Sequence, residues 1–158
     1  MSSADVWKCR DYYFYPSEKP LIMGILNVTP VSFSDGGKYF LQEAAIQRGL
    51  EMVKEGADII DIGGESTRPG ALPVDMEEEK NRVIPVVKTL AEKTEILISV
   101  DTMKAGVAEA AMAEGASIIN DVSALTADPE MINVVKKYNA GVILMHMKGI
   151  PRTMQDNP

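Results

Sequence analysis

The sequence has only one cysteine and one histidine among its 158 residues. A single cysteine cannot form an internal disulfide, so we expect a reducing compartment and a structural role for Cys9. The single histidine, His146, has no histidine or cysteine partner at metal-ligand spacing, which favours a structural or hydrogen-bonding role. No apolar stretch approaches the length of a membrane span, and the amino end lacks the basic-then-apolar order of a signal peptide. These absences predict a cytoplasmic protein.

Basic residues are also in the minority. Sixteen Lys and Arg stand against 23 Asp and Glu, a net charge of -7, which argues against a nucleic-acid surface and against membrane binding. Hydrophobic residues make up 46% of the chain and charged residues 25%, which is ordinary globular usage. The length allows one domain or part of one. We therefore expect residues 1–158 to form a single, incomplete domain.

Short apolar runs alternate with longer amphipathic stretches between residues 21 and 145. The apolar runs predict buried strands, and the stretches with an apolar residue every three or four positions predict helices. The predicted strands cover 21–27, 58–62, 96–100, 117–122 and 141–145, and the predicted helices cover 41–55, 75–91, 104–114 and the stretch after Asp128. Residues 1–20 hold most of the aromatic rings and predict a hairpin or extended cover over an apolar opening.

Capping residues support these helices. Asp75 and Glu78 form a capping-box pattern, which makes the acidic run that follows a helix start rather than a metal site. Pro85 is expected to kink that helix. Asp128 and Pro129 predict the cap and the first position of the fourth helix.

A repeat links two parts of the chain. Residues 55–61, EGADIID, return as residues 114–120, EGASIIN, two strand-helix units later. Recurrence on alternate strands is typical of a parallel barrel, in which alternate strands supply equivalent layers. The competing fold is a doubly wound open sheet, but its glycine-rich phosphate loop GxGxxG is absent. The sequence therefore predicts an α/β fold, a partial barrel of about five parallel strands and four helices.

Polar side chains follow all five predicted strands. These are Asn27, Asp61, Asp101, Asn120 with Asp121, and His146. In a parallel strand-helix fold they lie on one rim, where barrel enzymes hold their sites. Each also has a structural alternative: Asp101 could cap the helix at Lys104, and Asn120-Asp121 could bind loop backbone.

The residue types at this rim suggest a ligand. Asp101 offers only acceptors and Asn120 offers donors and acceptors, so together they can read the edge of a planar heterocycle with an amino group. Val122 and Met145 could wall the ring, or could be core residues.

Two predicted loops add to this rim. Ser66-Thr67-Arg68 suits an anion, although Arg68 could also form a surface salt bridge. The polar loop from Asn27 to Gly37 fits ligand contact as well as a plain turn.

Four stretches together resemble one known family. GILNVTPVSFSDGG, GADIIDIGGESTRPG, ISVDT and GASIINDVSA resemble, in this order, the signatures of the dihydropteroate synthases. The resemblance implies a TIM barrel of the pterin-binding kind. It also implies a transferase of folate synthesis, which condenses (7,8-dihydropterin-6-yl)methyl diphosphate with 4-aminobenzoate and releases diphosphate, with Mg²⁺ as cofactor and a homodimer for the complete protein.

The resemblance also implies roles for individual residues. Asn27 would contact the magnesium ion, and Asp101 and Asn120 would hold the pterin edge. Thr67 would bind the pterin diphosphate. The remaining candidates are Asp35 and Arg68 as catalytic residues on two mobile loops, Phe33 beside Asp35 near the 4-aminobenzoate pocket, and Val122 and Met145 as substrate contacts.

The chain departs from the family in two ways. Val31 stands where the family has an acid or its amide. The further pterin-binding Asp, Lys and Arg-x-His segment of the later strands have no counterpart, so we expect the amino-terminal portion of a synthase that is inactive by itself. Two alternatives remain open: a pterin-binding methyltransferase relative, and a non-catalytic half-barrel that assembles with another chain.

Overall fold

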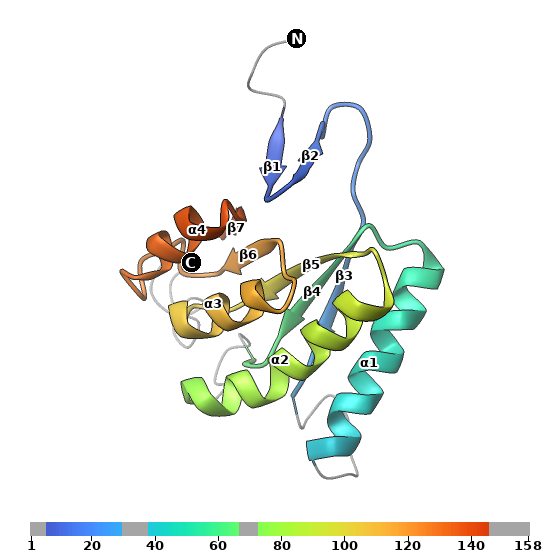
Figure 1. The fold of residues 1–158 in the computed structure, drawn as a ribbon, viewed down its shortest axis with the longest axis vertical. Helices are drawn as coiled ribbons and strands as arrows, with labels where there is room; N and C mark the ends of the chain where they lie inside the picture. The colour runs from blue at the N-terminus through green and yellow to red at the C-terminus, as the bar shows by residue number, and fades with distance from the viewer. Residues whose placement is uncertain (1–5, 30–37, 67–72, 146–158) are drawn as a thin grey trace, which may run out of the picture.

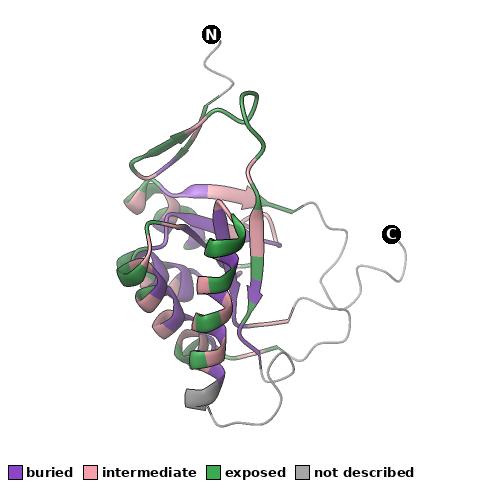
Figure 2. Ribbon diagram, turned by 90° about the vertical axis from the view of Figure 1, so that its right-hand side faces the viewer, coloured by how far each residue is buried: buried purple, intermediate pink, exposed green. Residues whose placement is uncertain are grey.

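The structure is a computed structural model that describes residues 6–29, 38–66 and 73–145. A parallel sheet of five strands, in the order β3-β4-β5-β6-β7, forms its centre. The helices cover one face of this sheet (Figures 1 and 2). The strands are β3 Met23–Asn27, β4 Ile59–Gly63, β5 Leu97–Asp101, β6 Ile118–Asp121 and β7 Gly141–Leu144; the helices are α1 Lys38–Glu55, α2 Met76–Lys93, α3 Ala105–Ala113 and α4 Met131–Tyr138. Five parallel strands and four helices confirm the fold predicted from the sequence.

One predicted helix start is confirmed and another is wrong. Asp75 is the N-cap of α2, and its carboxylate accepts a hydrogen bond from the Glu78 backbone N–H. The fourth helix, however, begins at Met131 with Glu130 as N-cap, and no side chain caps it. Asp128 accepts instead from the backbone N–H groups of Glu130 and, across 23 residues, of Ala105 at the start of α3. The Asp128 carboxylate therefore joins the start of α3 to the turn before α4, and it is not the N-cap that the local pattern predicts for α4.

The predicted repeat has a structural counterpart. The helix stops Gly56 and Gly115 both adopt positive φ, +99° and +116°, which glycine reaches without steric cost. Asp61 on β4 pairs with Ser99 on β5, and Ser99 pairs with Ile118 on β6. In the repeat, Ile118 corresponds to Ile59 and not to Asp61. The strand register is therefore shifted by two residues from β4 to β6, two strands away. An eight-stranded barrel of shear 8 needs this stagger of one residue per strand. The repeat thus reflects barrel geometry.

The two faces of the sheet pack against different partners. Strand residues that point toward the helices form the main core, among them Leu26, Ile62 and Val100. On the opposite face, the first residues of the strands meet a two-stranded hairpin made of β1 Trp7–Cys9 and β2 Tyr12–Phe14. Cys9, Ile59, Leu97 and Ile118 are buried there, with Trp7 and Phe14 packed against them.

The hairpin is tied down at its turn. The Arg10 guanidinium donates to the carbonyl oxygens of Met112 (3.1 Å) and Ala116 (2.8 Å), and the Arg10 N–H donates to Asn139 O. The predicted amino-terminal cover is confirmed: it closes the amino ends of the strands and leaves their carboxyl ends free. Burial raises the pKa of the Cys9 thiol to about 11, which agrees with a structural role for this residue. Within the described ranges, no helix is both long and apolar enough to cross a membrane.

Candidate functional site

A row of polar residues crosses the helix-free face of the sheet at the carboxyl ends of its strands. Asn27 pairs with Gly63, Gly63 with Asp101, and Asp101 with Asn120. Register partners in a parallel sheet point to the same side, and the residues before them, Leu26, Ile62, Val100 and Ile119, pack into the helix-side core. The three polar side chains therefore share the concave face. This placement brings together three of the residues predicted from the sequence.

Gly63 lies at the centre of this row. A methyl group added at its Cα would lie 3.3 Å from Asp101 Oδ2 and 3.7 Å from Asn27 Oδ1. The absence of a side chain thus lets a carboxylate oxygen and an amide oxygen flank one small space. Two convergent oxygens are suited to a donor group or a cation.

Asp101 is the carboxylate with the most altered acidity at this site. Burial, and after it the negative charges of Asp61, Glu79, Asp121 and Glu65, raise its pKa to about 7. No hydrogen bond offsets these effects within the part of the chain that the structure describes. A carboxylate that accepts nothing from the described residues has acceptor capacity available for a ligand, and a group with a strongly shifted pKa in a concave site is a functional candidate.

Asp61 lies one row below, at the level of Ser99. It is 4% exposed, and its Oδ2 accepts a hydrogen bond of 2.9 Å from Asn120 Nδ2. Burial raises its pKa, while Ser99 and Asn120 act in the opposite direction. Ser99 Oγ lies close enough to affect this acidity, yet neither it nor Asp61 Oδ1 completes a hydrogen bond of standard geometry. Among the described residues, these two buried atoms have no hydrogen-bond partner.

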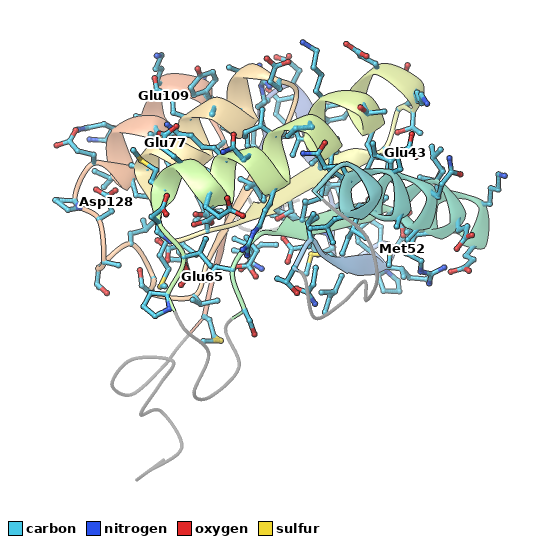
Figure 3. The ribbon with its side chains drawn as sticks, turned by 90° about the horizontal axis from the view of Figure 1, so that it is seen from below. Glu43, Met52, Glu65, Glu77, Glu109 and Asp128 are labelled. Atoms are coloured by element: carbon cyan, nitrogen blue, oxygen red, sulfur yellow. The ribbon has the colours of Figure 1, made fainter. Side chains whose placement is uncertain are left out.

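An ion-pair cluster supports the rim from the helix side. Lys104 Nζ contacts Glu65 Oε2 (2.5 Å) and Glu79 Oε2 (2.6 Å), and Glu79 is only 1% exposed. Glu65, labelled in Figure 3, also accepts from the Val74 N–H. Burial lowers the Lys104 pKa, but the bonds to the two acids outweigh it and the pKa is raised. The cluster connects the segment after β4 to the segment after β5.

A small cavity lies next to this cluster. It is lined by Asp101, Val122 and Lys104, among others. Val122 is 8% exposed and Met145 36%. Val122 and Asp101 therefore line the same small cavity, which agrees with either role predicted for Val122, ring wall or core.

The structure also decides between the alternatives for the strand ends. Asp101 does not cap α3, because Thr102 Oγ1 accepts from the Lys104 N–H. Asp121, on the helix side, does bind loop backbone, accepting from the N–H groups of Ser123 and Leu125. The predicted contacts Phe33, Asp35, Thr67 and Arg68, together with Val31 and His146, lie outside the described residues.

Sequence reasoning missed two features of this site. One is the ion pair between Lys104 and Glu79, and the other is the hydrogen bond between Asn120 and Asp61. Glu79 does lie in the first turn of α2, as the acidic run predicts, but no sequence pattern indicates that it is buried against Lys104. The available signal for Asp61 was the repeat, since Asp61 and Asn120 are its two terminal residues and are bonded to each other.

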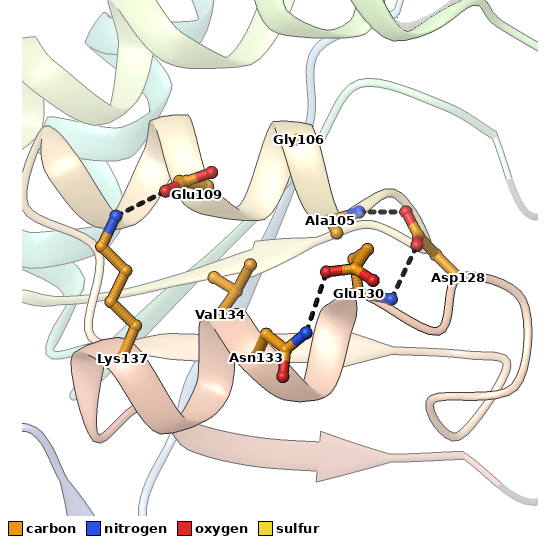
Figure 4. Close-up of a pocket in the computed structure, with 8 residues that line it drawn as sticks. All are labelled: Ala105, Gly106, Glu109, Asp128, Glu130, Asn133, Val134 and Lys137. Atoms are coloured by element: carbon orange, nitrogen blue, oxygen red, sulfur yellow. Dashed lines mark hydrogen bonds and ion pairs between the residues drawn. The ribbon is translucent and has the colours of Figure 1, made fainter.

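A second concavity of about 430 Å³ lies between α3 and α4 (Figure 4). Its charged groups already have partners. Lys137 binds Glu109 at 2.7 Å, Asn133 donates to Glu130, and both Asp128 oxygens accept backbone N–H groups. Each charged side chain that is described in this groove is therefore already engaged, and none of them identifies a ligand.

The described residues contain no cluster of three or more His, Cys, Asp or Glu suited to a metal ion. Asn27 supplies one amide oxygen to the rim. Mg²⁺ commonly takes one or two protein oxygens and completes its shell with water and phosphate oxygens. The donor set at the rim fits that mode of binding and does not fit a cage built entirely from protein.

Comparison with known proteins identifies the family to which the chain with this rim belongs. The model of the family described as "Pterin binding enzyme" matches residues 23–158, and the chain belongs to that family.

Within the family, its relatives include dihydropteroate synthases. The chain is 54% identical over 129 residues to the Bacillus subtilis dihydropteroate synthase, covering 82% of this chain and 45% of that protein. It is 50% identical to the Escherichia coli enzyme over 139 residues, covering 88% of this chain and 49% of the other. The chain thus spans about half the length of the curated relatives that it matches.

Solved structures agree with this result. A Xanthomonas albilineans dihydropteroate synthase with 4-aminobenzoic acid superposes with a TM-score of 0.85 at 49% identity, covering 92% of this chain and 52% of that chain. The same enzyme in complex with 7,8-dihydropteroate gives a TM-score of 0.79 at 45% identity, covering 90% and 51%. The arc of five strands therefore superposes on about half of these dihydropteroate synthase chains.

Proposed function

We propose that the protein containing this chain is a dihydropteroate synthase, which joins (7,8-dihydropterin-6-yl)methyl diphosphate to 4-aminobenzoate. The observation that carries the proposal is the row Asn27–Gly63–Asp101–Asn120 on one concave face. The relatives solved with 4-aminobenzoic acid and with 7,8-dihydropteroate support it, because those ligands are a substrate and the product of this reaction.

Asp101 and Asn120 would bind the edge of the pterin. A pterin carries an exocyclic amino group and ring nitrogens, so it presents donors to a carboxylate and a mixed edge to a carboxamide. The raised pKa of Asp101 supports this role, because the described residues donate no hydrogen bond to its carboxylate and a ligand could supply one. Val122 and Met145 would pack against the ring.

The reaction needs little proton transfer from the protein. The bond between the pterin methylene carbon and the diphosphate oxygen breaks, the amine nitrogen of 4-aminobenzoate bonds to that carbon, and the amine loses a proton. The electron-rich pterin stabilises positive charge on the methylene carbon. Catalysis then depends on positioning and on stabilising the departing anion.

Asn27 would hold Mg²⁺ together with the diphosphate oxygens, and the ion would supply charge neutralisation when bound. Thr67 would bind the diphosphate, with Arg68 beside it. Asp35 and Arg68 are proposed as catalytic residues on the two loops of this rim, and Phe33 as part of the 4-aminobenzoate pocket. A homodimer is proposed from the family resemblance, and a cytoplasmic location from the single cysteine.

The test is formation of dihydropteroate from the two substrates by the full-length protein. We expect Asp101→Asn to raise KM for the pterin diphosphate by at least about tenfold, the worth of one hydrogen bond to a charged group. Asp58→Asn is the matched control, since that carboxylate pairs with Lys19 at the amino end of the sheet. Absence of dihydropteroate formation, with methyl transfer to a corrinoid acceptor instead, would show the methyltransferase alternative to be correct.

A further inference from the structure

Asn120 is the one carboxamide in the polar row with a side-chain partner in the part of the chain that is described. Its Nδ2 donates to Asp61 Oδ2 at 2.9 Å, from β6 to β4, across the intervening strand β5. An ionised carboxylate only accepts hydrogen bonds. The amino group of Asn120 must therefore face Asp61, and the Asn120 carbonyl oxygen is left for the ligand.

Asp61 is unusually well placed to hold this orientation. It is 4% exposed, so water does not compete strongly for its oxygens, and Ser99, fully buried, lies beside it on β5. The Ser99 hydroxyl lies close enough to Asp61 to favour its charged form, although it completes no hydrogen bond of standard geometry. A carboxylate in this position costs free energy through desolvation. A role at the ligand site explains its presence.

We infer that Asp61 is a positioning residue that fixes the Asn120 carboxamide, and that the fixed carbonyl oxygen makes the site select a heterocycle with an exocyclic amino group over the same ring with an oxo group. This inference rests on the proposed function, because it assumes that Asn120 faces the pterin. A carboxamide that could turn over would present its amino group to the oxo analogue and bind both rings. Sites with oriented hydrogen-bonding groups reject the mismatched ligand because a buried group is left unpaired.

The experiment measures dissociation constants of the full-length protein by calorimetry for two pteridines. Pterin carries an amino group at the position where lumazine carries an oxo group. We expect the wild type to prefer pterin. Asp61→Asn has the same shape, but its carboxamide can accept or donate, so the Asn120 amide can bond to it in either orientation. The preference for pterin should therefore fall by roughly tenfold or more, one hydrogen bond's worth.

Asp61→Leu removes the partner completely and should change the preference in the same direction; if it fails to fold, Asp61→Asn still decides. Asp121→Asn is the matched control, because Asp121 is a fully buried carboxylate on the opposite face of the sheet. It should lower stability and leave the ratio of the two dissociation constants unchanged.

A merely structural role for Asp61 would weaken both ligands equally, and an unchanged ratio in Asp61→Asn overturns the inference. That result leaves the proposed function intact as long as the wild type binds pterin. If the wild-type protein binds neither pterin nor lumazine, both the inference about Asp61 and the proposed function are overturned.

Discussion

Replacing Asp101 by Asn should make the stability of the protein less dependent on pH. In the folded protein the pKa of Asp101 is raised from 3.8 to about 7, by burial first and by neighbouring acids second. Between these two values the folded state binds more protons than the unfolded state, so the free energy of unfolding of the wild type falls as pH rises from about 4 to 7. Above about pH 7 Asp101 is ionised in both states, and the full free-energy cost of its ionisation in the folded protein lowers the stability.

The size of this penalty follows from the pKa change. At 1.36 kcal/mol per pKa unit, a rise from 3.8 to about 7 corresponds to an upper limit of about 4 kcal/mol. Asp101 is only partly buried, so solvent screening reduces this to roughly 1–2 kcal/mol. Asn carries no charge at any of these pH values. We therefore expect Asp101→Asn to be more stable than the wild type by roughly 1–2 kcal/mol at pH 8, with a smaller difference at pH 5.

Urea denaturation of both proteins at pH 5, 6, 7 and 8 measures this difference. Asp58→Asn is a control of opposite sign. The Ile22 N–H and Lys19 lower the Asp58 pKa, so its contribution to stability is present at neutral pH and the variant should lose stability there. Parallel curves for the wild type and Asp101→Asn across the whole pH range would refute the argument, because they would show that Asp101 titrates alike in both states.

Three further outcomes follow from other contacts. Gly63→Ala should weaken pterin binding at least about tenfold by displacing Asp101, whose Oδ2 lies 3.3 Å from the new methyl group, and calorimetry would detect this; unchanged affinity contradicts the crowded geometry. Lys104→Met should cost about 3–5 kcal/mol in urea denaturation because it leaves Glu79 buried and unpaired, whereas Lys137→Met, at an exposed pair, should cost less than about 1 kcal/mol. Cys9 should react with a thiol reagent only after denaturation, and rapid reaction of the native protein would contradict its burial and raised pKa.

Local sequence patterns predicted the elements of this fold because each element carries its own signal. The apolar runs identified all five strands of the parallel sheet, and Asp75 with Glu78 identified the start of α2. Asp128 shows where such reasoning fails. Asp-Pro is a strong local start signal, but in the folded chain this carboxylate also binds the N–H of Ala105, 23 residues away, and α4 begins at Met131. No local pattern reports a partner at that distance.

The site was predictable to the extent that it depends on strand ends. Asn27 and Asp101 end their strands, Asn120 is the residue before the end of β6, and parallel strands end on the same side. The pairing of Lys104 with Glu65 and Glu79 was not predictable, because Glu79 has the same sequence context as the exposed acids of the first turn of α2. Its burial depends on where β5 and α3 place Lys104, which is a tertiary property.

Asn120 and Asp121 show how this sheet separates recognition from folding. They are neighbours in the sequence, and the alternation of a strand sends them to opposite faces. Asp121 is fully buried on the helix side and holds the turn after β6 through Ser123 and Leu125. Asn120 faces the concave side and bonds to Asp61. A substitution at Asp121 should therefore act first on stability and one at Asn120 first on ligand binding, because each side chain has its partners on only one face.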